Sequence, residues 1–202
     1  MEIVSSFLKW LVDNYIEILA TITGLIYLVY SVQGKILLWF FGLVTSALYV
    51  YVFFKSKIYA DMSINVYYVV ISIYGWIHWS IGGNNEKKEL PVSRLKLKLG
   101  MILALITLIV FIIIAFILNT YTDSDIAYWD AFVTSASITA TWMLARKILE
   151  HWLIWVVVDA ISIGLYIYKG LYPTVLLFFV YTMLAVVGFY EWKKQWKAKP
   201  NY

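Results

Sequence analysis

The residues best suited to chemistry in this sequence are Trp152, Trp155 and Asp159, within the stretch HWLIWVVVD. Positions i, i+3 and i+7 of a helix lie on one face. Two indole rings leading to one carboxylate suit a flat, cationic, aromatic ligand, because the rings stack and make cation–π contacts while the carboxylate supplies the counter-charge. The alternative is that Trp152 anchors a membrane interface and Trp155 is a packing residue. For the three residues together, we favour the binding site.

The chain as a whole has the composition of a membrane protein. Of its 202 residues, 63% are hydrophobic and 14% are charged, which is more apolar surface than a soluble domain of this length can bury. It contains no cysteine, which excludes disulfides, cysteine-based metal sites and thiol nucleophiles. The net charge of +4 lies in short gaps between apolar runs, so the sequence does not predict nucleic-acid binding.

The apolar runs predict an all-α integral membrane protein, since a helix needs about 20 mostly apolar residues to cross a bilayer. Seven transmembrane helices are expected, at 15–32, 36–54, 60–80, 99–118, 128–145, 151–168 and 171–189. The expected organisation is an N-terminal interfacial segment (1–14), a first three-helix bundle (15–81), a basic cytoplasmic loop with a linker helix (82–127), a second three-helix bundle (128–190) and a basic cytoplasmic tail (191–202).

Asp159 lies about halfway along the sixth predicted span. A carboxylate at that depth costs at least about 2.5–3.5 kcal/mol on insertion scales, so it should face a cavity or a partner. No lysine or arginine lies at a comparable depth in another predicted span, so a structural ion pair is poorly supported. A protonated aspartate that is hydrogen-bonded to a serine or threonine is the remaining alternative.

The distribution of charge predicts the orientation of the chain. One set of alternate gaps holds twelve basic residues: Lys35, Lys87, Lys88, Arg94, Lys96, Lys98, Arg146, Lys147, Lys193, Lys194, Lys197 and Lys199. The other set holds four: Lys9, Lys55, Lys57 and Lys169. The positive-inside rule therefore places the N-terminus outside and the C-terminus inside. The acids near the predicted outer ends either cap helix N-termini or form a negative vestibule: Glu17, Asp61, Asp123, Asp125 and Asp130.

Spans one to three and spans five to seven form a faint internal repeat. At a shift of 113 residues the matches are Tyr59 with Tyr172, Tyr68 with Tyr181, Gly75 with Gly188, and Trp79 with Trp192. At a shift of 117, LYVY (48–51) matches LYIY (165–168), which we attribute to a shorter gap in the second copy. The two copies run in the same direction, so the predicted architecture is 3+1+3 with parallel repeats, and such transporters bind their substrate near the midplane.

Several stretches resemble the PnuC family of bacterial vitamin transporters. HWLIWVVVD is similar to that family's WxxWxxxN/D signature, and the resemblance extends over nearly the whole chain, through FFGLVTSALYVYVFFKSKIYA (40–60), YGWIHW (74–79), YWDAF…ARKILEHWLIW (128–155) and GLYIYKGLY (164–172). The resemblance implies a seven-helix, full-length SWEET-like fold in a bacterial cytoplasmic (inner) membrane. It also implies vitamin uptake by facilitated diffusion with trapping by phosphorylation, and a homo-oligomer, for which a trimer is the known case.

The resemblance also implies which residues bind the substrate. Trp152, Trp155 and Asp159 match the signature, Thr45 and Asn65 match polar positions of the cavity, and Tyr68 and Trp76 lie in the matching third span. Trp79 is read as an anchor at the inner membrane interface, while Tyr68 is either a stacking wall or not involved. The outer pair Trp129 and Asp130 is read as structural first.

Three departures bear on which vitamin is carried. Members that take up nicotinamide riboside typically have asparagine at the end of the signature, and Asn and Gln where this chain has Thr45 and Asn65; this chain ends the signature with Asp159. It looks more like the PnuT branch, which carries thiamine. A carboxylate can pair with the amino group and a protonated ring nitrogen of thiamine's aminopyrimidine. Nicotinamide riboside, which is also cationic, remains the alternative.

Other function classes have less support. The sequence contains no HExxH or GxSxG motif, and its predicted last span lacks the lysine that a retinal protein needs, so we predict no enzyme, no metal site and no cofactor. A receptor would bind ligand without transporting it. Proton-coupled transport through Asp159 is a closer alternative, which the dependence of uptake on a proton gradient would decide.

Overall fold

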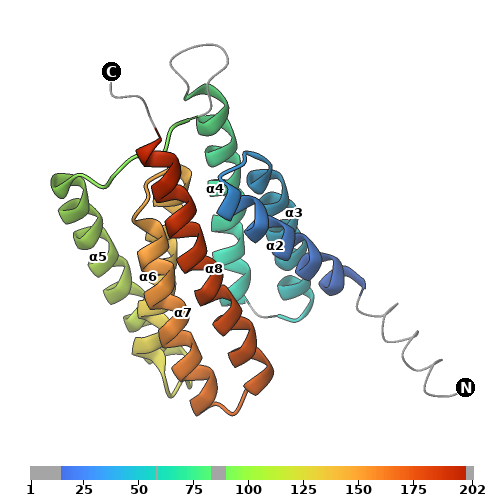
Figure 1. The fold of residues 1–202 in the computed structure, drawn as a ribbon. Coiled ribbons are helices and arrows are strands. Elements are labelled where there is room, and N and C mark those ends of the chain that lie inside the picture. Colours follow the sequence, from blue (N-terminus) through green and yellow to red (C-terminus); the bar gives the residue numbers. More distant parts are fainter. Residues whose placement is uncertain (1–14, 58, 83–89, 199–202) are drawn as a thin grey trace, which may run out of the picture. The chain divides into compact units, whose positions relative to one another are not determined.

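The computed structural model describes residues 15–57, 59–82 and 90–198, and these residues form an all-helical fold (Figure 1). The helices are α2 (Tyr15–Gln33), α3 (Leu37–Lys55), α4 (Tyr59–Ile81), α5 (Leu97–Tyr121), α6 (Ala127–Ala145), α7 (His151–Tyr168) and α8 (Tyr172–Lys197). All seven predicted helices are confirmed to within a few residues at most ends. The exception is α8, which continues to Lys197 instead of ending at 189. The predicted interfacial segment (1–14), and parts of the predicted loop (83–89) and tail (199–202), lie outside the described residues.

The chain divides into two compact units, residues 1–82 and 83–202. In the first, α3 packs against both α2 and α4. In the second, the helices pack in series, α5 on α6, α6 on α7 and α7 on α8. Helix α3 is therefore the central helix of its unit, and α7, which carries the WxxWxxxD stretch, is held on two sides by α6 and α8.

Among the described residues, five helices are long and apolar enough to cross a membrane: α2, α3, α5, α7 and, from Thr174, α8. The other two, α4 and α6, are long but more polar. In α6 the polar side chains are buried and satisfied, because Ser137 and Thr141 donate to carbonyls one turn back and Thr139 shares a 2.6 Å hydrogen bond with Thr107 of α5. A helix covered in this way need not be apolar, so seven spans remain our prediction.

A buried tryptophan joins the last two helices of the first unit. Trp39 of α3 is 1% exposed, and its ring packs edge-to-face on Trp79 of α4, with 5.6 Å between centroids. The ring fills the space beside Gly75, where an added Cβ would lie 2.4 Å from two of its atoms. The prediction that Trp79 anchors a membrane interface is wrong: it is 4% exposed and lies inside this contact.

The second unit contains the same arrangement. Trp152 of α7 is 3% exposed and packs edge-to-face on Trp192 of α8, with 5.9 Å between centroids. A Cβ on Gly188 would lie 2.5 Å from the Trp152 ring. The predicted matches of Gly75 with Gly188 and of Trp79 with Trp192 therefore share one packing geometry.

The turns of the two units keep the same register. The residues with positive φ after α2 and α6 are Gly34 (φ 69°) and Lys147 (φ 54°), and those after α3 and α7 are Lys57 (φ 59°) and Gly170 (φ 71°). Each second member lies 113 residues after the first. The predicted change of shift to 117 around 48–51 and 165–168 is wrong, because the turns on both sides of α3 and α7 hold the shift at 113.

We expect Gly188→Ala to lower the free energy of unfolding by about 1–3 kcal/mol, the usual cost of overpacking a core. The new methyl group would overlap the Trp152 ring, which is enclosed by α8 and cannot withdraw freely. Thermal unfolding of the purified protein in detergent measures the change. Gly164→Ala in α7 is the matched control, since nothing lies within 4 Å of its added Cβ; equal losses in both variants would contradict the packing role.

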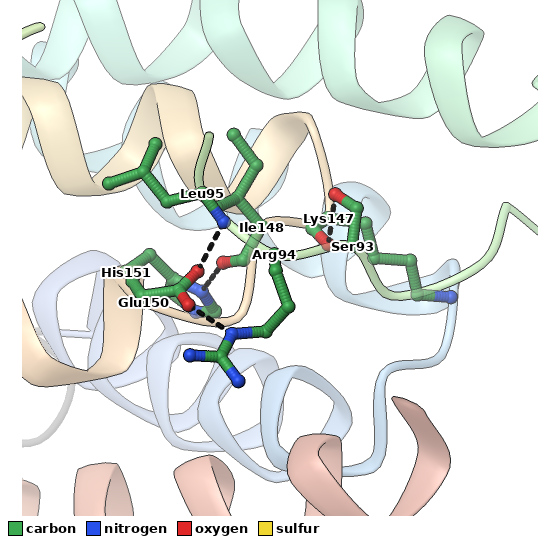
Figure 2. A network of polar contacts seen from close by, with 7 residues as sticks. All are labelled: Ser93, Arg94, Leu95, Lys147, Ile148, Glu150 and His151. Atoms are coloured by element: carbon green, nitrogen blue, oxygen red, sulfur yellow. Dashed lines mark hydrogen bonds and ion pairs between the residues drawn. The ribbon is translucent and has the colours of Figure 1, made fainter. Parts of the chain in front are cut away.

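A short strap before α5 ties the second unit together at the start of α7 (Figure 2). The amide of Ser93 donates to the Lys147 carbonyl, and the amide of Leu149 donates to the Ser93 carbonyl, both at 2.9 Å. The Glu150 carboxylate accepts from the Leu95 amide at 2.7 Å and forms an ion pair with Arg94.

The same strap reaches the end of α8, because the Arg94 guanidinium lies over the Trp196 ring at 5.1 Å. Glu150 directly precedes α7, and it joins the strap to the residue from which α7 starts. Sequence reasoning treated residues 90–96 as part of a basic loop and missed this contact. The strap fixes the start of the helix that carries Trp155 and Asp159.

We expect Glu150→Ala to cost about 1–3 kcal/mol of unfolding free energy, because the partly buried Leu95 amide and the Arg94 guanidinium lose their common acceptor. Glu150→Gln keeps an acceptor for the amide and should recover most of that loss. Glu191→Ala, an exposed glutamate of α8, is the control and should be close to neutral in the same thermal unfolding measurement. If Glu150→Ala and Glu191→Ala unfold alike, the strap is not a stabilising element.

Candidate ligand-binding site

Asp159 lies near the middle of α7 and is buried, with 4% of its surface exposed. Within the described residues its carboxylate has no hydrogen bond and no ion pair. The nearby hydroxyl on the same helix, that of Ser162, donates to the Val158 carbonyl at 2.8 Å. A buried carboxylate without a partner is costly, and a cationic ligand with hydrogen-bond donors would offset that cost.

The two tryptophans of the stretch differ in their surroundings. Trp155 is half-buried, so part of its ring is accessible. Trp152 is enclosed by Gly188, Trp192 and the His151 ring, and its indole nitrogen has no hydrogen-bond partner in the part of the chain that is described. The alternative in which Trp152 is an interface anchor is therefore wrong. Trp155 and Asp159 are the members of the trio best placed to meet a ligand, and the role of Trp152 in binding remains a prediction.

In the first unit, the predicted polar residues lie on the inner helices. Thr45 of α3 donates to the Thr23 hydroxyl at 2.8 Å, and Thr23 in turn donates to carbonyls of its own helix. Asn65 of α4 is half-buried and donates from Nδ2 to the Asp61 carbonyl at 2.8 Å. Because Thr45 and Asn65 act as donors in these hydrogen bonds, each side chain keeps an oxygen that can accept from a ligand.

The predicted aromatic residues of α4 follow the same face of the helix as Asn65. Tyr68 packs at a tilt on Tyr67, with 5.6 Å between centroids. Trp76 is 38% exposed and packs edge-to-face on Phe40 of α3, at 6.0 Å. Tyr68 therefore lies in a tyrosine pair, whereas Trp76 contacts α3 and keeps a large accessible surface.

The acidic residues before α6 have structural partners. Asp130, in the first turn of α6, accepts from the Ser124 hydroxyl at 3.2 Å, and Asp125 pairs with Lys169 at 3.9 Å. Asp61 and Glu17 also lie in first turns, of α4 and α2, where a carboxylate interacts favourably with the helix dipole. These positions favour the helix-end reading of the acids over a vestibule. Within the described residues, no group of three or more His, Cys, Asp or Glu side chains could hold a metal ion.

Comparison with known proteins gives a consistent result. The sequence profile of the family described as "Nicotinamide mononucleotide transporter" matches residues 14–194. Among curated proteins, the nicotinamide riboside transporter PnuC of Escherichia coli (strain K12) is 26% identical, over 89% of this chain and 85% of that protein. The nicotinamide riboside transporter PnuC of Haemophilus influenzae is 24% identical, over 90% of this chain and 80% of that protein.

The fold also matches a solved structure. The crystal structure of the vitamin B3 transporter PnuC superposes with a TM-score of 0.72, at 24% sequence identity, covering 97% of this chain and 88% of that one. At this level of identity the match establishes the fold, while the site rests on the residues described above.

Proposed function

The chain belongs to the nicotinamide mononucleotide transporter family, and from that premise we propose that it is a uniporter for a cationic vitamin, with thiamine as the substrate. The observation that carries this proposal is the buried, unpartnered Asp159 carboxylate in the middle of α7, which has no partner among the described residues. A neutral substrate would leave the cost of that charge in place, whereas a cation removes it.

Thiamine suits this carboxylate in two ways. Its thiazolium is cationic, and its aminopyrimidine offers an amino donor beside a ring nitrogen that can be protonated. A carboxylate can accept from both in a charge-assisted pair, which is stronger than a neutral one. An asparagine, as found in nicotinamide riboside carriers that the chain resembles, offers a single acceptor without the charge.

The proposed binding residues come from both units. In the second unit, Asp159 pairs with the aminopyrimidine or the cationic ring, Trp155 stacks on it, and Trp152 supports Trp155 from the neighbouring turn. In the first unit, Thr45 and Asn65 accept hydrogen bonds, and the aromatic contacts come from Tyr68 and Trp76.

Nicotinamide riboside is the second candidate substrate, because the curated relatives described above are named for it. To separate the two, the purified full chain is titrated with thiamine and, separately, with nicotinamide riboside, following quenching of tryptophan fluorescence. Saturable quenching at low concentration by thiamine alone supports the thiamine proposal. Saturation by nicotinamide riboside alone overturns it in favour of the second candidate, and saturation by neither overturns the binding site itself.

The further features of the proposal follow the sequence. They are seven spans in a 3+1+3, full-length SWEET-like arrangement, an outside N-terminus and a cytoplasmic C-terminus in a bacterial inner membrane, and a homo-oligomer, with a trimer as the expected form. Transport is by facilitated diffusion, and cytoplasmic phosphorylation traps the vitamin. Uptake into proteoliposomes that is unchanged when a proton gradient is imposed or collapsed supports uniport; uptake that follows the gradient instead supports the proton-coupled alternative.

A further inference from the structure

The common register of the two units assigns a counterpart to each residue of α7. Trp39 beside Gly75 and Trp152 beside Gly188 have the same burial and the same wedge geometry, and both pairs are related by 113 residues. The turns before and after α3 and α7 keep that spacing. The position of Trp155 on α7 is therefore equivalent to Gly42 on α3.

Unit 1 nevertheless has an aromatic ring at this place. The ring of Tyr27, from α2, lies over Gly42, and an added Cβ on that glycine would be 3.1 Å from both Cδ2 and Cε2 of the tyrosine. The tyrosine ring therefore occupies the space into which a side chain at position 42 would project. In unit 2 the residue equivalent to Tyr27 is Ala140, a fully buried small residue of α6. Each unit thus has one large ring and one small residue at this helix contact, with the two helices exchanging roles.

The surroundings of Tyr27 are those of the proposed site in unit 1. Its hydroxyl is within electrostatic range of the tyrosine pair Tyr67 and Tyr68. One turn earlier on α2, Thr23 accepts the hydrogen bond from Thr45. Tyr27 is half-buried, so its ring is partly accessible. It therefore lies beside two residues, Thr45 and Tyr68, that the family resemblance places at the ligand.

We propose that Tyr27 is a further ligand-contacting residue, the counterpart in unit 1 of Trp155, and that it helps to set which cationic aromatic vitamin is bound. The inference rests on the proposed function and adds a residue that the WxxWxxxD stretch does not contain. The face of a phenol ring can stack on a flat cationic ring, and its hydroxyl can donate or accept one hydrogen bond.

The test compares Tyr27→Leu, which removes the ring, with Tyr27→Phe, which removes only the hydroxyl. Tyr27→Leu is expected to raise the dissociation constant of the vitamin by about tenfold, a loss typical of one ring contact to a cation. Tyr27→Phe is expected to keep most of the affinity but to change the ratio of thiamine to nicotinamide riboside affinities. A packing role alone would lower both affinities by the same factor.

Tyr30→Leu is the matched control, because Tyr30 lies one turn further along α2 and stacks on Phe41 of α3 at 5.5 Å, away from Gly42. It should leave both affinities unchanged. A second variant, Gly42→Ala, reaches the same ring from α3, since the new methyl group would displace it; it should weaken binding, whereas Gly164→Ala should not.

Three outcomes are informative. Loss of binding in Tyr27→Leu and Gly42→Ala, with normal binding in Tyr30→Leu and Gly164→Ala, supports the inference. Normal binding in Tyr27→Leu, when Asp159→Ala has lost it, overturns the inference and leaves the proposed function standing. Normal binding in Asp159→Ala overturns the proposed site, and the assignment of Tyr27 with it. Thermal unfolding of each variant confirms that the protein tested is folded.

Discussion

Replacing Asp159 with alanine is expected to weaken vitamin binding by about 100-fold or more. Removing one partner of a buried, hydrogen-bonded charge pair typically costs about 3–5 kcal/mol, which exceeds two decades in the dissociation constant. In the ligand-free protein the carboxylate is buried and has no partner among the described residues, so the pair would form only when the cation binds. Isothermal titration calorimetry of the purified chain measures the loss.

The same substitution has an opposite expected effect on stability. Because the ligand-free protein bears the cost of a buried, unpaired carboxylate, Asp159→Ala should unfold at a higher temperature than the wild type without ligand. The increase in melting temperature that the vitamin produces in the wild type should disappear in the variant. A gain in stability combined with a loss of binding is the signature of a residue retained for its ligand.

Asp130→Ala is the matched control for this prediction. Asp130 accepts from Ser124 in the first turn of α6, so its removal should lower stability and leave binding unchanged. The two aspartates should therefore respond in opposite directions in both measurements. If Asp159→Ala is destabilised without ligand and still binds the vitamin, Asp159 is a structural residue and the proposed site is wrong.

The sequence predicted the helices well because apolar runs of about 20 residues, separated by short polar gaps, have few other structures open to them in a membrane. Even the more polar α6 was found, because its gaps are clear. The end of α8 was missed, since the residues after 189 are charged and continue the helix beyond the apolar run to Lys197. Hydropathy reports the limits of the apolar run, not those of the helix.

The candidate site was predicted in part. The depth of Asp159 follows from its position in the run, and its burial agrees with the expectation that it avoids lipid. The surroundings of Trp152 could not be predicted, because helical periodicity gives a face but not the neighbour that covers it. That neighbour is Gly188, whose lack of a side chain admits the ring. The predicted match of Gly75 with Gly188 was the available signal, and it was not connected to a tryptophan.

Tyr27 and the strap were missed for a different reason. Tyr27 belongs to no motif, and its importance depends on lying over Gly42, fifteen positions along the chain on another helix. The strap depends on Glu150 reaching a backbone amide at Leu95, which no composition or periodicity encodes. Contacts made by one side chain across a long separation appear only when the helices are assembled.

Replacing Asp159 with asparagine is expected to separate charge from hydrogen bonding at this position. Both thiamine and nicotinamide riboside are cationic, so loss of the carboxylate charge should weaken the binding of both. Only thiamine also loses the pair with its amino group and protonated ring nitrogen, since the asparagine amide keeps one acceptor oxygen and introduces donors in place of the other. Thiamine affinity should therefore fall by about tenfold more than nicotinamide riboside affinity, measured by calorimetry with each vitamin on the same preparation.

The ratio of the two losses distinguishes two roles for the carboxylate. A larger loss for thiamine means that Asp159 reads the aminopyrimidine, and that exchange between Asp and Asn at the end of the stretch changes the preferred vitamin. Equal losses mean that Asp159 is a counter-charge alone, and selectivity must then come from other contacts, of which the nearest candidates are Thr45, Asn65 and Tyr27. A ratio that moves in Tyr27→Phe but not in Asp159→Asn would assign the choice of substrate to the first unit, and the neutralisation of its charge to the second.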